Sequence, residues 1–281
     1  MYSWRKVKDR MFFVLILTIS ILAITPIIHM MVAVLANGFP MILKAGWGFF
    51  VKTPPTPLSQ DIGGIAPSLI GTAILTLVSL PITIVLALFS AILVNEFPRN
   101  PLSIAIDVVA KSLASIPTIA VSMVIYILVV VPMGRFSALA GAIALTIVAL
   151  PYAYTYISTV LGSIPLTYRE AAYSIAMSRW KTIVKVLLPI AKRGFAIGIL
   201  MTMARILGET AALLFVVGRY RTATSISIIE PVDAIPLLIF DYILTPYPIM
   251  QQIAWASAAF LLLIYITIFI AIKIIVKEVR L

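Results

Sequence analysis

The stretch REAAYSIAMSRWKTIVKVLLPIAKR, residues 169–193, separates two long apolar segments of the chain. It is strongly basic, with the cations Arg169, Arg179, Lys181, Lys185, Lys192 and Arg193. A basic loop between segments suited to lipid is typical of the cytoplasmic side of a membrane protein. We therefore interpret it as a docking surface that faces the cytoplasm, and the apolar segments around it decide the fold class.

The composition is that of a membrane protein. Of the 281 residues, 62% are hydrophobic and 11% are charged, and the mean hydropathy is +1.15. Several charge-free intervals are long enough for the roughly 20 residues that a membrane helix needs. These runs lack the alternation of membrane β-strands, so helices are expected. We predict an all-α integral membrane protein, one domain over residues 1–281, with about six spans near 11–36, 67–94, 113–131, 136–158, 194–217 and 251–272.

The distribution of Lys and Arg predicts the orientation. With both termini in the cytoplasm, 15 of the 21 cations lie inside: Arg5, Lys6, Lys8, Arg10, Arg99, Lys111, the six of the basic loop, Lys273, Lys277 and Arg280. Outer segments then carry Lys44, Lys52, Arg135, Arg219 and Arg221, while Arg205 lies within a span. The positive-inside rule therefore predicts a multi-pass protein of the cell membrane with both termini cytoplasmic. The net charge of +11 is explained by topology, and no nucleic-acid partner is expected.

Two connections are expected to carry structure. The inner loop over residues 159–193 contains the basic stretch, and the outer loop over 218–250 contains AIPLLIFDYIL at 234–244. That segment is apolar but too short to cross a membrane, so we predict a helix at the outer interface. Asp107 and Lys111 have helical i,i+4 spacing and predict a second short interfacial helix before the third span.

Motifs of enzymatic chemistry are missing from the sequence. There is no Gly-Lys pair and hence no P-loop, no HExxH and no GxSxG. The chain has no cysteine, which excludes disulfides and thiolate metal sites. We predict neither a catalytic residue nor a metal site nor a cofactor on this chain.

The basic stretch has helical signals of its own. Thr167 and Glu170 have the spacing of a capping box, and Ser178 is a good cap for a second helix that Pro189 would disturb. Two short helices meeting near residues 177–178 would make a protruding knob. The alternative is a solvated basic loop that only obeys the positive-inside rule.

Here the sequence resembles the permeases of ABC importers. Glu170-Ala171-Ala172, then Ala176, then VLLP at 186–189, is similar to their EAA loop, whose pattern is EAA, a glycine and I-x-L-P. The resemblance implies the type I importer (MetI-like) fold. It also implies a coupling helix that enters a groove on an ATPase subunit, with Arg169, Glu170, Ala171, Ala172, Ala176, Leu188 and Pro189 as coupling residues. Two residues depart from the pattern: Ala176 replaces the usual glycine and Val186 replaces the isoleucine.

Further strings narrow the resemblance to phosphate-transport permeases of the PstA type. They are GGIAPSLIGT (63–72), LASIPTIAVSMVIY (113–126), MGRFSALAGAIAL (133–145) and ARILGETAALLF (204–215). This resemblance implies import of inorganic phosphate with a second permease of the PstC type, a PstB-type ATPase dimer that binds ATP and Mg, and an extracytoplasmic phosphate-binding protein.

Charged residues within the fifth span point to a substrate pathway. Arg205 lies about 18 Å along a helix from Arg193, near mid-membrane, and Glu209 is one turn further on. Small residues flank the pair at four-residue spacing, on one track at Gly194, Gly198 and Thr202 and on another at Ala204, Gly208 and Ala212. Charges at this depth are costly, so we assign Arg205, Glu209 and Thr210 to the pathway of an anion. The alternative is a structural pair that locks this helix to its neighbours.

Other functions remain open from the sequence. An ABC permease for molybdate, sulfate or phosphonate would keep the EAA loop. A secondary transporter should show inverted repeats or broken helices, and it would leave the EAA pattern unexplained.

Overall fold

The computed structural model describes residues 2–277, so Arg280 lies outside the described residues. The described part of the chain is helical, and its extended backbone pairs only in an isolated bridge between Gly218 and Val232. The α-helices are α1 (Tyr2–Ala45), α2 (Gly48–Val51), α3 (Ala66–Glu96), α4 (Pro101–Leu113), α5 (Thr118–Ile125), α6 (Val131–Met133), α7 (Ala138–Gly162), α8 (Leu166–Ser174), α9 (Arg179–Thr182), α10 (Leu188–Leu207), α11 (Ile235–Ile243) and α12 (Pro248–Lys277). Two π-helical turns, η1 (Tyr126–Val130) and η2 (Ile183–Leu187), and a 3₁₀ turn, η3 (Ala211–Leu213), complete them.

The predicted spans correspond to helices of the structure. Within residues 2–277, α1, α3, α7 and α12 are each long and apolar enough to cross a membrane. Helix α4 and the helical segment from α5 to α6 meet at an angle of 106°, and the two together can count as a fifth span. Helix α10 occupies the place of the remaining predicted span, but its twenty residues include Lys192, Arg193 and Arg205, and it is not among the helices apolar enough to cross, so residues 2–277 hold four or five such spans rather than six. The all-α membrane protein is confirmed, but the fifth predicted span ends early, because α10 stops at Leu207 rather than near 217.

The centre of the molecule is the packing of α3 against α7. Small side chains make this close approach possible, since Ala87 and Ala91 of α3 and Ala144, Ala149 and Ala153 of α7 are all buried. Helix α10 packs on the same pair. These three helices form the packed body of the molecule, and α10 carries Arg205.

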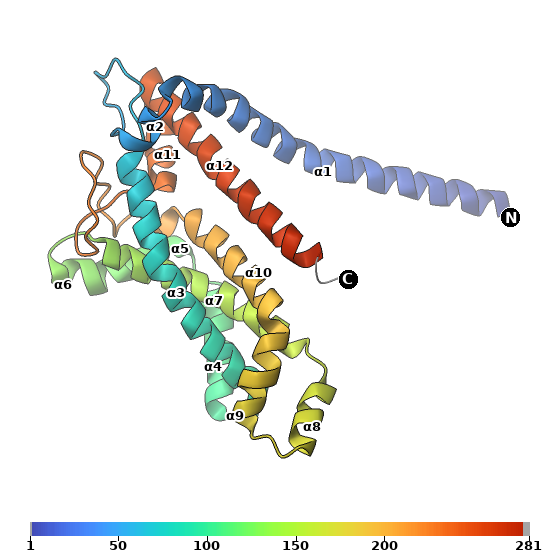
Figure 1. The fold of residues 1–281 in the computed structure, drawn as a ribbon. Helices are drawn as coiled ribbons and strands as arrows, with labels where there is room; N and C mark the ends of the chain where they lie inside the picture. Colours follow the sequence, from blue (N-terminus) through green and yellow to red (C-terminus); the bar gives the residue numbers. More distant parts are fainter. Residues whose placement is uncertain (1, 278–281) are drawn as a thin grey trace.

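Two further apolar clusters close the ends of this body. One joins the end of α3 with α4, α7 and η2, and the other joins α11 with α12 and Phe49. In Figure 1 helices α8 and α9 lie at one end of the molecule and α2 and α11 at the other. Helix α11 is the short helix predicted in the outer loop, and Ile235, Leu237 and Leu238 bury its apolar side within the protein.

Helix α1 is a long arm that leaves the body (Figure 1). Only its last part packs on α12, where a Cβ on Gly38 would lie 2.1 Å from the carbonyl oxygen of Trp255. From Lys8 to Met30 every side chain is exposed, although most are large and apolar. The helix continues through Pro26 and Pro40 to Ala45, nine residues beyond the predicted end.

Two other prolines are accommodated by π-helical turns. The Leu188 N–H donates to the Ile183 carbonyl just before Pro189, and the Val131 N–H donates to the Tyr126 carbonyl just before Pro132. A proline ring clashes with the carbonyl four residues back in a regular α-helix, and a wider turn relieves this clash. Pro189 therefore widens the helix without ending it, and α9, η2 and α10 form one continuous helix.

Candidate functional site

Arg205 and Glu209 form the ion pair that the sequence predicts. The Arg205 Nη2 lies 3.0 Å from Glu209 Oε2. Helix α10 ends between the two residues, so Glu209 stands in the following turn, and its Oε1 accepts a hydrogen bond from the Ala212 N–H at 3.2 Å. The Glu209 side chain is only 5% exposed, whereas that of Arg205 is 35% exposed. The carboxylate is thus fixed in the protein, and the guanidinium keeps one open side.

The surroundings of Arg205 leave part of its hydrogen-bonding capacity unused. Its guanidinium carbon lies 5.0 Å from the centre of the Tyr152 ring, a cation–π contact. Among the described residues, Arg205 Nε is the one buried side-chain nitrogen or oxygen without a hydrogen-bond partner. A buried donor without an acceptor is costly. One donor of Arg205 is therefore left without an acceptor among the described residues.

One glycine of each small-residue track packs closely on a neighbouring helix, although α10 ends at Leu207, before Gly208 and Ala212 of the second track. On the first, a Cβ on Gly194 would be 2.5 Å from the Val160 side chain of α7. On the second, a Cβ on Gly208 would be 2.2 Å from the hydroxyl of Tyr265 on α12. Thr210, half-buried, follows directly and begins the η3 turn. Close packing on both sides holds the Arg205–Glu209 region in place.

The basic stretch folds into two short helices, α8 and α9, which we call the knob together with the turn between them (residues 166–182). Ser178 caps α9 as predicted, accepting a hydrogen bond from the Lys181 N–H. The predicted capping box is wrong: α8 begins at Leu166 after Pro165, so Thr167 lies inside its first turn and no side chain caps the helix.

Ala176, the departure from the EAA pattern, lies at the turn of the knob with a positive φ of 57°. Its N–H donates to the Tyr173 carbonyl at 2.9 Å, and the Met177 N–H donates to the Ala172 carbonyl at 3.1 Å. These two bonds are a Schellman motif, whose left-handed residue is usually glycine. The alanine therefore adopts the conformation that the usual glycine would take without strain.

The remaining predicted coupling residues differ in how far their side chains are exposed. Glu170, Ala171 and Pro189 are exposed and Leu188 is half-buried, but Ala172 is buried against the chain itself. Large apolar side chains protrude from the knob, with Ile175 71% exposed and Trp180 61% exposed. Arg169 differs from the others, because its guanidinium pairs with Glu96 of α3.

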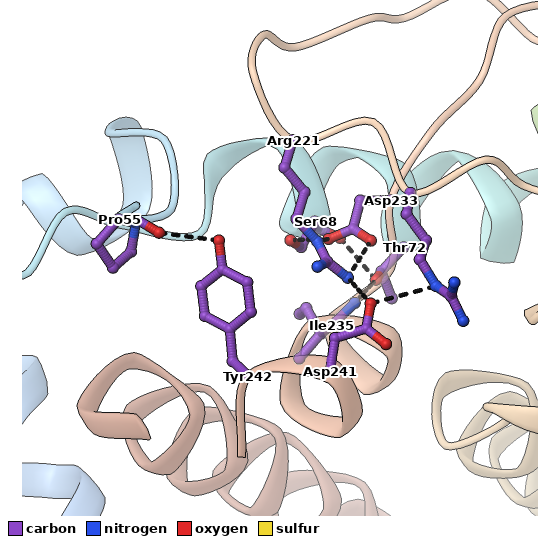
Figure 2. Close-up of polar contacts among 9 residues, drawn as sticks. Pro55, Ser68, Thr72, Arg221, Asp233, Ile235, Asp241 and Tyr242 are labelled. Carbon is purple, nitrogen blue, oxygen red and sulfur yellow. Dashed lines mark hydrogen bonds and ion pairs between the residues drawn. The ribbon is translucent and has the colours of Figure 1, made fainter. Parts of the chain in front are cut away.

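A second polar cluster lies at the opposite end of the molecule (Figure 2). The Arg221 Nε donates to Asp233 at 2.9 Å, and its Nη2 donates to Asp241 at 2.7 Å. Ser68 of α3 donates to Asp233, and Arg219 lies 3.2 Å from Asp241. Asp233 is completely buried. Burial alone would lower the pKa of Arg221, but its pairing with the two aspartates outweighs burial and raises that pKa.

This cluster joins the 218–234 segment to α3 and α11. The Ile235 N–H donates to Thr72 at 2.9 Å, and a Cβ on Gly71 would be 2.0 Å from the Asp233 carbonyl oxygen. The charge distribution predicts Arg219 and Arg221 only as outer cations and assigns no role to the aspartates. The signal was present, since Glu230, Asp233 and Asp241 share one apolar loop with the two arginines.

The sequence pattern of the family described as binding-protein-dependent transport system inner membrane component matches residues 83–281. The chain belongs to this family. As a binding-protein-dependent inner membrane component it is a transporter subunit rather than an enzyme.

Relatives of this inner membrane component carry the name that the sequence strings indicate. The probable phosphate transport system permease protein PstA of Methanocaldococcus jannaschii is 35% identical over 274 residues, which cover 98% of this chain and 95% of the relative. PstA of Xylella fastidiosa (strain 9a5c) is 33% identical, covering 80% and 77%. PstA 1 of Mycobacterium tuberculosis (strain CDC 1551 / Oshkosh) is 28% identical, covering 95% and 88%. The resemblance to the PstA type is confirmed.

Among solved structures, this inner membrane component is similar to a chain of the MetNI methionine ABC transporter in an inward-facing conformation. The TM-score is 0.59 at 19% identity, with 75% of this chain and 95% of that chain covered. At this identity the likeness establishes the fold alone, and the expected MetI-like fold is confirmed.

Proposed function

We propose that this chain is the permease subunit of an ATP-driven importer of inorganic phosphate and forms half of its translocation pathway. The curated relatives are named as phosphate transport permeases. The observation that supports this at the level of chemistry is the Arg205 side chain, which is 35% exposed although it pairs with the buried Glu209. The exposed part of this guanidinium can donate charged hydrogen bonds to a phosphate oxygen.

Glu209 gives the site a way to release its anion. It already neutralises Arg205, at 3.0 Å, and it competes with phosphate for the same guanidinium. A permease must bind its substrate weakly enough to let it leave. Thr210, next to Glu209, stays a proposed pathway residue on its position alone.

The partners follow from the family and from two unpartnered surfaces. We propose a second permease subunit of the PstC type beside the exposed α1 arm, and a PstB-type ATPase dimer that receives the knob through Ile175 and Trp180. An extracytoplasmic phosphate-binding protein delivers the substrate. ATP and Mg bind the ATPase, and no cofactor is required on this chain.

The orientation completes the mechanism. The knob and both termini face the cytoplasm in the cell membrane, and the 218–250 loop with α11 faces outward. ATP closes the ATPase dimer, the knob moves with it, and the permease changes between inward-open and outward-open states. The ATPase can drive this change only if it binds the knob differently in the two states.

Replacement of Arg205 by Gln tests the proposal. Each charged hydrogen bond contributes about 1.5–3 kcal/mol. Loss of the guanidinium should therefore lower the rate of phosphate uptake about 10- to 100-fold. The matched control is Arg135→Gln, which removes an exposed arginine. Uptake is measured in proteoliposomes that contain the full complex, and co-purification of the ATPase shows that the complex assembles.

Two results would contradict the proposal. One is normal phosphate uptake by the assembled Arg205→Gln complex. The other is import by the native complex of molybdate, sulfate or phosphonate in preference to phosphate, which would assign the same site to another oxyanion.

A further inference from the structure

Arg169 belongs to the stretch that the family uses for docking, yet its side chain is directed into the protein. It is only 12% exposed, and the Glu96 side chain that it meets is 4% exposed. Nε and Nη2 of Arg169 donate to Glu96 Oε1 at 3.1 and 2.8 Å. An arginine in this position has little surface to offer an ATPase.

The same guanidinium also binds the end of α7. Its Nη1 donates to the Ile164 carbonyl at 3.0 Å, and its Nη2 donates to the Leu161 carbonyl at 3.3 Å. Leu161 is in the last turn of α7 and Ile164 is in the connection that follows it, and a cation at this end complements the helix dipole. One side chain of α8 thus joins the ends of α3 and α7.

The knob has two attachments to the body, and they reach different helices. On one side α9 continues through η2 into α10, which carries Arg205. On the other side α8 follows α7 after a short connection. Ala172 is the one buried residue of α8. The hydrogen bonds of Arg169 therefore hold α8 to α3 and α7. Tyr152, which contacts Arg205, lies on α7.

We propose that Arg169 and Glu96 form a strut that makes α3, α7 and α10 move as one body when the ATPase displaces the knob. Arg169 is a positioning residue in this role. With the strut in place, α10 keeps its register against α7, so Arg205 stays over Tyr152. Without it, displacement of the knob acts on α10 alone and hydrolysis is no longer converted into transport.

The inference rests on the proposed phosphate importer, and its test uses the complete complex with its binding protein. The variant Glu96→Gln/Arg169→Met removes both charges, so that neither is left buried without its partner. The ATPase should still co-purify, because the exposed apolar residues of the knob are unchanged. Phosphate transported per ATP hydrolysed should fall about tenfold, within the range of coupling between distant sites. The control Arg135→Met makes the same arginine-to-methionine change at an exposed residue outside the knob and should keep the native ratio.

A rescue experiment separates a mechanical role from a general loss of folding. The chain contains no cysteine, so Glu96→Cys/Arg169→Cys introduces the only two thiols into it. With cysteine-free partner subunits, bifunctional methanethiosulfonates of increasing length should restore the ratio to within about twofold of native at one length. A covalent link would then replace the ionic strut.

The proposal is overturned if the double variant transports the native amount of phosphate per ATP. It is also overturned if uptake and hydrolysis fall in parallel and no cross-linker restores them. If the native complex imports no phosphate, the proposed function fails instead. The strut is then tested by the stimulation of ATP hydrolysis by the binding protein, which the double variant should lose and Arg135→Met should keep.

Discussion

Replacing Ala176 by glycine should stabilise the knob. Ala176 has a φ of 57° and closes the Schellman motif of α8. A left-handed L-residue costs about 1–2 kcal/mol, and glycine removes that strain. Glycine also raises the conformational entropy of the unfolded segment, which offsets about 0.4–1 kcal/mol of this stabilisation. The net gain for local opening of the turn is about 0.5–1 kcal/mol, or two- to fivefold slower amide exchange.

The assay is hydrogen–deuterium exchange of the assembled complex, followed by mass spectrometry of peptides that cover residues 166–178. The amides of Ala176 and Met177 report directly, because both donate in the motif. Ala171→Gly is the matched control. It makes the same chemical change inside exposed helix α8, where glycine costs about 1 kcal/mol, so exchange should become faster.

Opposite signs for the two glycine variants are the expected result. Faster exchange in Ala176→Gly, as in Ala171→Gly, would refute the assignment of left-handed strain to Ala176. It would also remove the physical reason for the glycine in the EAA pattern at this turn.

Two further variants test the packing of the substrate region and of the opposite end. Tyr152→Leu should raise the KM for phosphate uptake about three- to thirtyfold, because it removes the cation–π contact with Arg205, whereas Tyr152→Phe should leave KM near native. Equal effects of Leu and Phe would contradict a role for the ring. Gly71→Ala should destabilise the chain by about 1–3 kcal/mol, since its Cβ would be 2.0 Å from the Asp233 carbonyl oxygen. Thermal unfolding in detergent measures this, and Gly198→Ala, whose Cβ would have an ordinary contact of 3.5 Å, should change little.

Features with a local cause could be predicted from the sequence. The charge-free intervals predicted the spans, because lipid excludes charges over a fixed length. Ser178 predicted the start of α9, and the spacing of Arg205 and Glu209 predicted their pairing. Each of these signals lies within a few residues of its effect.

Other features depend on competition or on distant partners. Thr167 and Glu170 had the right spacing for a cap, but α8 begins two residues too early for them, with Pro165 in the cap position. The first span was expected to end near residue 36, yet α1 continues to Ala45, and Gly38 in this extension packs on α12. The partners of Arg169 and Asp233 are 73 and 165 residues away in the chain. No single sequence pattern specifies such pairs, because the packing of α3 decides them.

The exposed arm of α1 has a consequence for the biogenesis of the chain. Lipid tails solvate leucine and isoleucine as well as another protein does, so the arm costs a lone subunit nothing once it is inserted. In water the same surface would be strongly unfavourable and prone to aggregation. The arm must therefore enter the membrane during synthesis, whereas assembly with the partner subunits can follow later. The unassembled subunit can diffuse in the bilayer until its partner subunits are synthesised.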